Sequence, residues 1–306
     1  MILRTVCLLI TVSLILPVPR TASAKPNPDD IPPGHQSVRA GNVPIAYTDQ
    51  GEGEPLIILT PYRFSTAIWN DLAARLSSSM RVIVVEPPGL RAPKSMKGDF
   101  SDIRLLELYR DLVKALGLSQ VHILGVGESG MEAAGFGHHW PNLTKSIISI
   151  NGLEVAKWSD KVQAMLESLK QAGSGEEASL IPTLSLRWRD KTPAGDEMDR
   201  LFVPRGDRKS QKAFEMRLAA YRDSLRAGFV PFMVENLNKP ILLIRSQEDQ
   251  FLTEDYYNRA QQIIPESVFQ YEVVPDAGHF AFVDQPDKVA ELIRAFVAKN
   301  VESQGY

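Results

Sequence analysis

Cysteine is almost absent from this sequence, since Cys7 is the only one among 306 residues. It lies in an apolar N-terminal stretch that we expect to be removed, so the remaining chain would hold neither a disulfide nor a thiol nucleophile. Basic residues are not in excess either, because 34 Lys and Arg stand against 37 Asp and Glu. A mildly acidic chain without a basic stripe is a poor candidate for nucleic-acid binding. We expect neither a metal ion nor an organic cofactor, and the sequence carries no signal for an oligomeric state.

The first 24 residues have the pattern of an export signal. Arg4 supplies a positive charge, residues 6–16 are almost entirely apolar, and Ala-Ser-Ala at 22–24 is a typical cleavage site. The apolar run is too short to span a bilayer comfortably, and an uncleaved membrane anchor is the alternative. We therefore expect a signal peptide over residues 1–24, export to a periplasm or out of the cell, and no membrane attachment after cleavage.

The remaining chain begins with a proline-rich segment and then alternates between strand-like and helix-like patterns. Residues 25–34 hold four prolines and two aspartates and predict a flexible leader. After them, short apolar runs typical of buried strands alternate with amphipathic helical segments. We expect these strands at 43–48, 55–60, 81–86, 121–124, 146–150, 240–244 and 268–274. Such alternation predicts an α/β fold, with a mostly parallel sheet and helices on both of its faces.

The alternation stops between residues 153 and 237. This stretch has no convincing strand pattern, and its segments 161–171 and 211–227 have the spacing of amphipathic helices. A helical insertion within an α/β chain indicates a cap, or lid. We therefore predict a core formed by residues 35–152 and 238–306, with a helical cap over the carboxyl ends of the strands.

Three of the loops that follow predicted strands carry chemically useful residues. They read Gly-Val-Gly-Glu-Ser-Gly at 125–130, Ser-Gln-Glu-Asp at 246–249 and Pro-Asp-Ala-Gly-His-Phe at 275–280. In chain order they supply a sharp turn, an acid and a histidine. Because ligands bind beyond the carboxyl ends of the strands in an open parallel sheet, we expect the three loops to form one site.

This order of turn, acid and histidine resembles that of the α/β-hydrolase superfamily. The histidine loop, the acid loop, a Glu-Pro-Pro-Gly loop at 86–89 and the helical insertion are each similar to parts of that family. The resemblance covers nearly all of the chain after the expected signal. It implies an α/β-hydrolase fold of about eight strands, in which Asp249 is the triad acid and His279 the triad histidine.

The nucleophile turn departs from the family pattern of Gly-x-Ser-x-Gly-Gly. An ungapped match from Gly125 to Pro141 places Gly127 where the nucleophile should stand, and glycine has no side chain that can attack a carbonyl. The loop that precedes the oxyanion site departs as well, with Thr-Pro-Tyr-Arg at 60–63 where the family often has His-Gly. We expect the backbone amides of Tyr62 and Glu128 to point into the site.

Other interpretations of the same turn remain open. Ser129 could be a displaced nucleophile, although two residues along a helix it would point about 200° away from position 127. A serine at that place more often satisfies backbone groups at the start of a helix. The side chain of Glu128 is a candidate acid or base. Gly-x-Gly-x-x-Gly followed by Glu154 also matches a dinucleotide-binding fingerprint, but that unit normally begins its domain.

Three functional hypotheses follow from these residues. In the first, His279 oriented by Asp249 is a general base that acts without a serine nucleophile. It would activate water against a small, largely apolar ester or lactone, or take a proton directly in lyase or cyclase chemistry. In the second, the chain only binds a hydrophobic small molecule. In the third, it is a serine hydrolase that uses Ser129.

Overall fold

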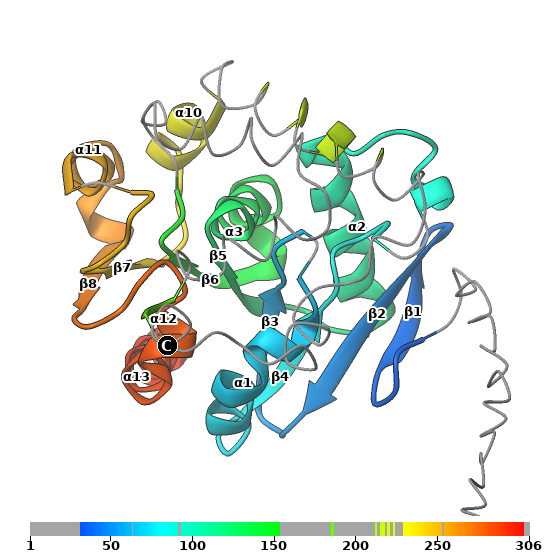
Figure 1. Cartoon of the computed structure of the whole chain (residues 1–306), viewed down its shortest axis with the longest axis horizontal. Coiled ribbons are helices and arrows are strands. Elements are labelled where there is room, and N and C mark those ends of the chain that lie inside the picture. The colour runs from blue at the N-terminus through cyan, green and yellow to red at the C-terminus, as the bar shows by residue number, and fades with distance from the viewer. Residues whose placement is uncertain are drawn as a thin grey trace, which may run out of the picture.

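An eight-stranded sheet lies at the centre of the part of the chain that the structure, a computed structural model, describes (Figure 1). The described residues are 31–62, 64–90, 93–153, 185–186, 212, 215–217, 219–220, 223, 229–252 and 254–302. The strands are β1 (Gln36–Ala40), β2 (Val43–Gln50), β3 (Glu54–Leu59), β4 (Met80–Val85), β5 (Val121–Val126), β6 (Thr144–Ile150), β7 (Ile241–Ser246) and β8 (Phe269–Val274).

The order of the strands across the sheet is β1-β2-β4-β3-β5-β6-β7-β8. β1 pairs with β2, and β2 with β4, in antiparallel fashion. Every later pair of neighbours is parallel. The carboxyl ends of β5, β6, β7 and β8 therefore meet at one edge of the sheet, which brings the loops that follow them together.

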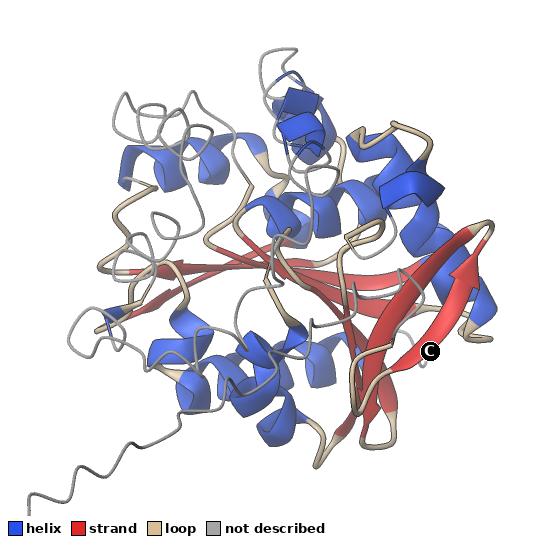
Figure 2. Cartoon of the chain, turned by 45° about the vertical axis from the view of Figure 1, so that its right-hand side comes forward, coloured by secondary structure: helices blue, strands red, loops and turns tan. Residues whose placement is uncertain are grey.

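Helices cover both faces of this sheet (Figure 2). One face carries α2 (Asp102–Ala115), α3 (Glu128–His139), α10 (Phe229–Glu235) and α11 (Glu254–Ile263), and the other α1 (Asn70–Leu76), α12 (Ala281–Asp284) and α13 (Pro286–Glu302). Alternate residues of a strand point to opposite faces. In β3, Ile57 thus packs beneath α2 and α3, whereas Ile58 packs against the layer of α1 and α13.

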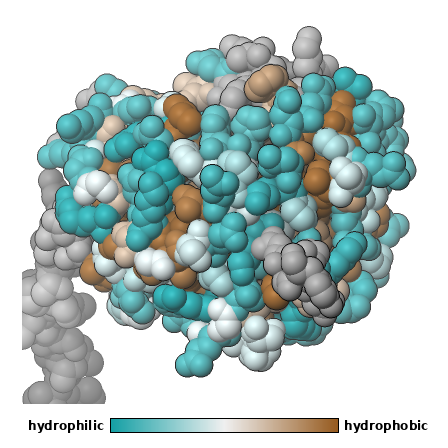
Figure 3. Space-filling model, turned by 180° about the vertical axis from the view of Figure 1, so that it is seen from behind, coloured by the Kyte–Doolittle hydropathy of each residue, from teal (hydrophilic) through white to brown (hydrophobic). Residues whose placement is uncertain are grey.

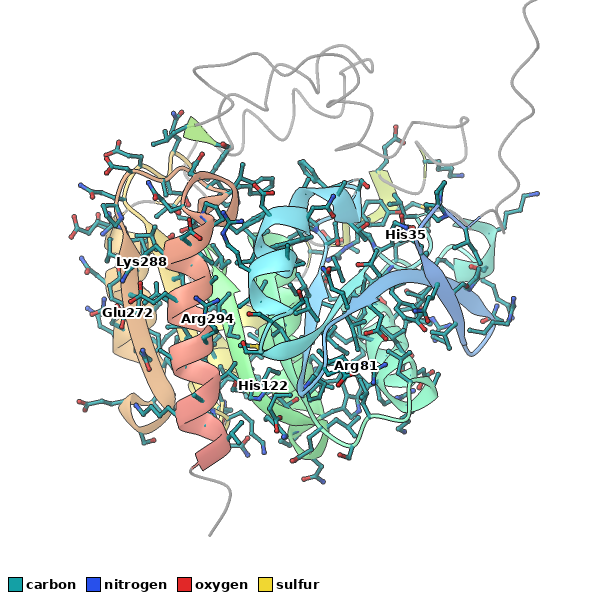
Figure 4. All side chains as sticks on the ribbon, turned by 90° about the horizontal axis from the view of Figure 1, so that it is seen from below. His35, Arg81, His122, Glu272, Lys288 and Arg294 are labelled. Carbon is teal, nitrogen blue, oxygen red and sulfur yellow. The ribbon has the colours of Figure 1, made fainter. Side chains whose placement is uncertain are left out.

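The second layer is joined by polar contacts as well as by its apolar core. Arg294 of α13 lies toward α1 and donates a hydrogen bond to the carbonyl oxygen of Arg75 (3.3 Å; Figure 4). Arg75 in turn pairs with Asp287 at the start of α13 (2.6 Å). On the outer surface seen in Figure 3, apolar residues are interspersed among hydrophilic ones. No helix in the described ranges has the length and apolar character needed to cross a membrane.

The predicted fold class is confirmed, with an eight-stranded, mostly parallel sheet and helices on both faces. The expected signal peptide at 1–24 lies outside the described residues, as does the leader up to residue 30. Most of the predicted cap, 153–237, also lies outside them. Within that range, α10 is described and packs on α3.

Candidate active site

Gly127 forms the turn between β5 and α3, and its backbone adopts a conformation that few other residues tolerate. Its φ of 52° and ψ of −122° lie in a region that strains a residue with a side chain. The Gly127 amide donates to the carbonyl oxygen of Ile150 (3.0 Å), which ties the turn to the neighbouring strand. The turn therefore holds residue 127 sharply at the carboxyl edge of the sheet.

The neighbouring glycines allow the strand and the helix to approach each other closely. A Cβ atom on Gly125 would lie 2.1 Å from the carbonyl oxygen of Ser129, and one on Gly130 would lie 2.4 Å from Ser149 Oγ. Both contacts are far inside van der Waals distance, so the turn requires glycine at these positions. The close packing of the turn thus explains why these glycines match a dinucleotide-binding fingerprint. The acid expected in that fingerprint, Glu154, lies outside the described residues.

His279 faces the position where a side chain of residue 127 would begin. A Cβ atom built on Gly127 would stand 2.8 Å from His279 Nε2. Among the described residues, no other side chain comes as close to that point. This geometry supports the interpretation that residue 127 occupies the nucleophile position, and that the imidazole is directed at the space that a nucleophile would fill.

The structure brings the two predicted triad residues together. His279 Nδ1 lies 3.1 Å from Asp249 Oδ2, with the Asp249 side chain fully buried and that of His279 13% exposed. The other oxygen of Asp249 accepts a hydrogen bond from the amide of Phe251 (2.8 Å). Because a carboxylate only accepts hydrogen bonds, the shared proton belongs on Nδ1, which leaves a lone pair on Nε2. His279 Nε2 is therefore directed at the space above Gly127.

Asn151, which the sequence reasoning missed, connects the acid loop with the histidine loop. Its Nδ2 donates to Ser246 Oγ (2.6 Å) and to the carbonyl oxygen of His279 (2.7 Å). Its Oδ1 accepts from the Ser246 amide (2.8 Å) and from the Tyr257 hydroxyl (2.9 Å). The available signal was a polar residue immediately after the buried strand 146–150. Burial, and then the charge of Asp249, raise the pKa of Tyr257, so its hydroxyl stays a donor.

The amide of Tyr62 is already engaged. It donates to Glu128 Oε1 over 2.8 Å, whereas the sequence led us to expect a donor open to a substrate oxygen. The difference arises because the residue after Gly127 carries a carboxyl group long enough to reach back to this amide. The place where an oxyanion would normally be stabilised therefore holds an oxygen atom of the protein itself.

The Glu128 carboxyl lies in an environment that opposes its ionisation. Burial is the largest cause of its raised pKa, and the charge of Asp102 adds to it. The charge of Arg217 and the hydrogen bond from Tyr62 act in the opposite direction. The raised pKa indicates that the protein favours the neutral acid more than water does.

One turn further along α3, Glu132 belongs to a buried polar cluster beside Glu128. Arg217 donates to Glu132 Oε1 (2.6 Å) and to Asp102, and the Tyr109 hydroxyl donates to Glu132 Oε2 (3.0 Å). Burial is the main cause that raises the pKa of Glu132 to about 7. No pattern in the sequence predicted this cluster, because its members come from distant segments and meet only through packing.

Ser129 does not face the dyad. Its side chain is fully buried, and its Oγ accepts from the Val126 amide (2.9 Å). As a donor it has two carbonyl oxygens within reach, those of Leu59 and Val126, each at 3.0 Å. None of these hydrogen bonds involves His279. The arrangement is that of a serine that fastens the start of α3 to β3 and β5, rather than that of an activated nucleophile.

Comparison with known proteins gives the family. A family model for the alpha/beta hydrolase fold matches residues 54–286, about three quarters of the chain. The chain therefore belongs to the α/β-hydrolase family, which confirms the resemblance found in its sequence. No group of three or more His, Cys, Asp and Glu within the described ranges is arranged to hold a metal ion.

Several relatives of the chain are hydrolases. Epoxide hydrolase 3 of Xenopus tropicalis is 23% identical over 295 residues, which is 87% of this chain and 78% of that protein. 3-Oxoadipate enol-lactonase 1 of Acinetobacter baylyi is 23% identical over 233 residues, 75% of this chain and 83% of that protein. The solved 2-hydroxy-6-oxo-6-phenylhexa-2,4-dienoate hydrolase of Rhodococcus superposes with a TM-score of 0.74 at 13% identity, covering 86% of this chain and 98% of its own. That structural likeness shows the fold.

Proposed function

We propose that this chain is an exported enzyme in which the His279–Asp249 dyad acts as a general base without a covalent nucleophile. The observation that carries the proposal is the 2.8 Å between His279 Nε2 and the Cβ position of residue 127. A base held this way takes a proton from whatever occupies the space above Gly127, either a water molecule or the substrate itself. The substrate class is a small, largely apolar carbonyl compound such as an ester, a lactone or a ketone.

Two chemical routes are open to such a base. In the first, His279 takes a proton from water while the water oxygen attacks an ester or lactone carbonyl. The kinship with an enol-lactonase supports this substrate class. In the second, His279 takes a proton from the carbon next to the carbonyl. The hydrogen bond from the Tyr62 amide to Glu128 Oε1 (2.8 Å) favours the second route. While this bond is made, the amide cannot stabilise the oxyanion of a tetrahedral intermediate.

A second candidate function is binding without chemistry. The observation that favours it is that residue 127 has no side chain while the Tyr62 amide is already satisfied. A site that has lost both features can still accept a hydrophobic small molecule beneath a helical cap. In that case His279 contributes to the wall of the pocket and its replacement alters affinity only modestly.

The test is turnover of p-nitrophenyl acetate, δ-valerolactone and a panel of ketones by His279→Ala, Asp249→Asn and Ser129→Ala. His138→Ala, at the far end of α3, is the matched control. We expect rates lower by on the order of 10²-fold or more in His279→Ala, a smaller loss in Asp249→Asn, and wild-type rates per folded molecule in Ser129→Ala and in the control. Full activity in His279→Ala would refute the dyad mechanism. Loss only in Ser129→Ala would instead establish a serine hydrolase.

A further inference from the structure

The two oxygens of the Glu128 carboxyl have different surroundings. Oε1 accepts the Tyr62 amide at 2.8 Å. Oε2 makes no hydrogen bond to any residue in the described part of the chain, and the Glu128 residue is partly exposed. One oxygen is thus fixed by the backbone while the other remains available to a ligand.

We propose that Glu128 is the acid partner of His279, and that its Oε2 donates a hydrogen bond to the carbonyl oxygen of the substrate. This inference rests on the proposed function of the dyad. It assigns to a side chain the role that backbone amides would play in an oxyanion hole. It also narrows the substrate class to ketones or keto esters with an acidic C–H bond beside the carbonyl group.

The positions of the two groups support this pairing. The Tyr62 amide marks the side of the site on which a substrate oxygen would be bound, and the Glu128 carboxyl is held on that amide. His279 Nε2 lies over the Cβ position of the adjacent residue, Gly127. A carbonyl group with its oxygen at Glu128 would therefore present its neighbouring carbon to the base. An acid and a base that reach the same substrate can act in the same step.

The surrounding charges favour a neutral Glu128. Arg217 is a cation of the buried cluster, and among the described residues it donates to Asp102 and Glu132 and not to Glu128. Each further ionised carboxylate in this buried cluster needs a partner for its charge, which makes ionisation of both Glu128 and Glu132 costly. The pKa of Glu128 is raised, chiefly by burial. A carboxylic acid kept neutral in this way is a stronger hydrogen-bond donor than a backbone amide.

The step balances without any external reagent. His279 Nε2 takes the proton from the carbon beside the carbonyl, and the C–H electron pair becomes the new C=C bond. The carbonyl π pair moves to oxygen, which receives the proton of Glu128, so an enol forms. The enol then returns its O–H proton to Glu128. As the O–H pair re-forms the C=O bond, the C=C pair takes the imidazolium proton, either at the original carbon, which gives exchange, or at the far carbon of a conjugated C=C bond, which gives an isomer. Where the next carbon carries a leaving group, the C=C pair instead forms a new C=C bond to that carbon, and the leaving group departs with its bonding pair and takes the imidazolium proton.

The test is exchange of C–H for deuterium in D₂O, followed by NMR, with cyclohexanone, acetophenone and 2-tetralone as probes. The variants are Glu128→Gln and His279→Ala, with Glu107→Gln, at a partly exposed position of α2, as the matched control. We expect the wild type and the control to accelerate exchange. We also expect His279→Ala to abolish the acceleration, and Glu128→Gln to lower it by about tenfold to a hundredfold while thermal unfolding stays cooperative.

The pH dependence gives a readout that a purely structural role would not move. Wild-type exchange should decline at high pH as Glu128 ionises, its pKa being raised chiefly by burial, and Glu128→Gln should lose that decline. An unchanged rate and profile in Glu128→Gln, with exchange still dependent on His279, would overturn this inference and leave the dyad proposal intact. Wild-type rates in His279→Ala would overturn both. No acceleration of any probe by the wild type would also refute enolisation.

Discussion

His279 Nε2 stands 2.8 Å from the point where a Cβ atom on Gly127 would lie. A carbon and a nitrogen atom do not normally come this close without a bond, so the imidazole already occupies part of the space that a side chain at 127 would need. The imidazole of His279 can stand this far forward only because residue 127 is a glycine. Any larger residue at 127 must push the imidazole back and must also accept the strained backbone of the turn.

Gly127→Ala should lower the free energy of unfolding by about 1–3 kcal/mol through backbone strain, with a further loss from contact with His279. Gly117→Ala is the matched control, since Gly117 has a φ of 69° and nothing within 4 Å of its Cβ position. Urea unfolding of both variants, alone and with His279→Ala, separates the two effects. The cost of Gly127→Ala should shrink in the His279→Ala background. An equal cost in both backgrounds would show that the imidazole does not face residue 127.

Asn151→Ala should destabilise the fold and weaken any dyad-dependent activity together. The substitution leaves the Ser246 amide and the Tyr257 hydroxyl without their acceptor, and each such buried group costs about 1–3 kcal/mol. It also removes the bond that holds the His279 carbonyl. Urea unfolding measures the first effect and substrate turnover the second. Asn142→Ala, at an exposed position, is the control, and an Asn151→Ala variant as stable as this control would contradict the role given to Asn151.

A Ser–His–Glu arrangement, separate from the candidate active site, lies at the opposite edge of the sheet, among the amino ends of β3, β5 and β6. His122 Nδ1 is 2.7 Å from Ser146 Oγ, and its Nε2 is 3.7 Å from Glu54 Oε2. His122 is labelled in Figure 4, and both it and Ser146 are fully buried. No substrate can reach a serine that is covered in this way, so Ser146→Ala should retain the activity of the wild type. Loss of activity in a stably folded Ser146→Ala variant would show that this arrangement has a catalytic role.

This buried histidine should make the fold sensitive to acid. Burial is the main cause that lowers the pKa of His122 from 6.5 to about 4, while Glu54 opposes the change. Because the folded pKa is below the unfolded one, stability is fully present above pH 6.5 and is lost as pH falls toward 4. The loss should reach about 3 kcal/mol. Urea unfolding between pH 4 and 7 should show this loss in the wild type. In His122→Gln, the free energy of unfolding should depend less steeply on pH. An equal pH dependence in both proteins would contradict the assignment of the acid sensitivity to His122.

Glu132 should produce a pH dependence of the opposite sign. Its pKa is raised from 4.5 to about 7, chiefly by burial, so its contribution to stability is present below pH 4.5 and lost as pH rises through 7. Glu132→Gln should therefore flatten the decline in the free energy of unfolding between pH 6 and 8. The exposed pair of Lys288 and Glu291 supplies the control Glu291→Gln. A decline that persists unchanged in Glu132→Gln would indicate that another group takes up or releases the proton.

The sequence predicted most of the sheet because buried parallel strands appear as continuous apolar runs. It missed β1 (Gln36–Ala40), an edge strand in which only Ala40 is fully buried, so no such run marks it. Gly127, Asp249 and His279 could be found because each follows a strand and their chain order is informative. The Tyr62–Glu128 bond and the Arg217 cluster could not, because they depend on side-chain conformations and on contacts between distant segments.

Labelling with a fluorophosphonate, read by intact-protein and peptide mass spectrometry, tests the central claim most directly. The wild type should remain unlabelled, because Gly127 has no nucleophile and Ser129 is buried. Gly127→Ser should react weakly, while Gly127→Ser with Glu128→Ala should react faster, because the Tyr62 amide is then released to stabilise the adduct. Label at position 127 of these variants that disappears with His279→Ala is the result we predict. Label on Ser129 of the wild type, or no reaction in a folded double variant, would contradict the account.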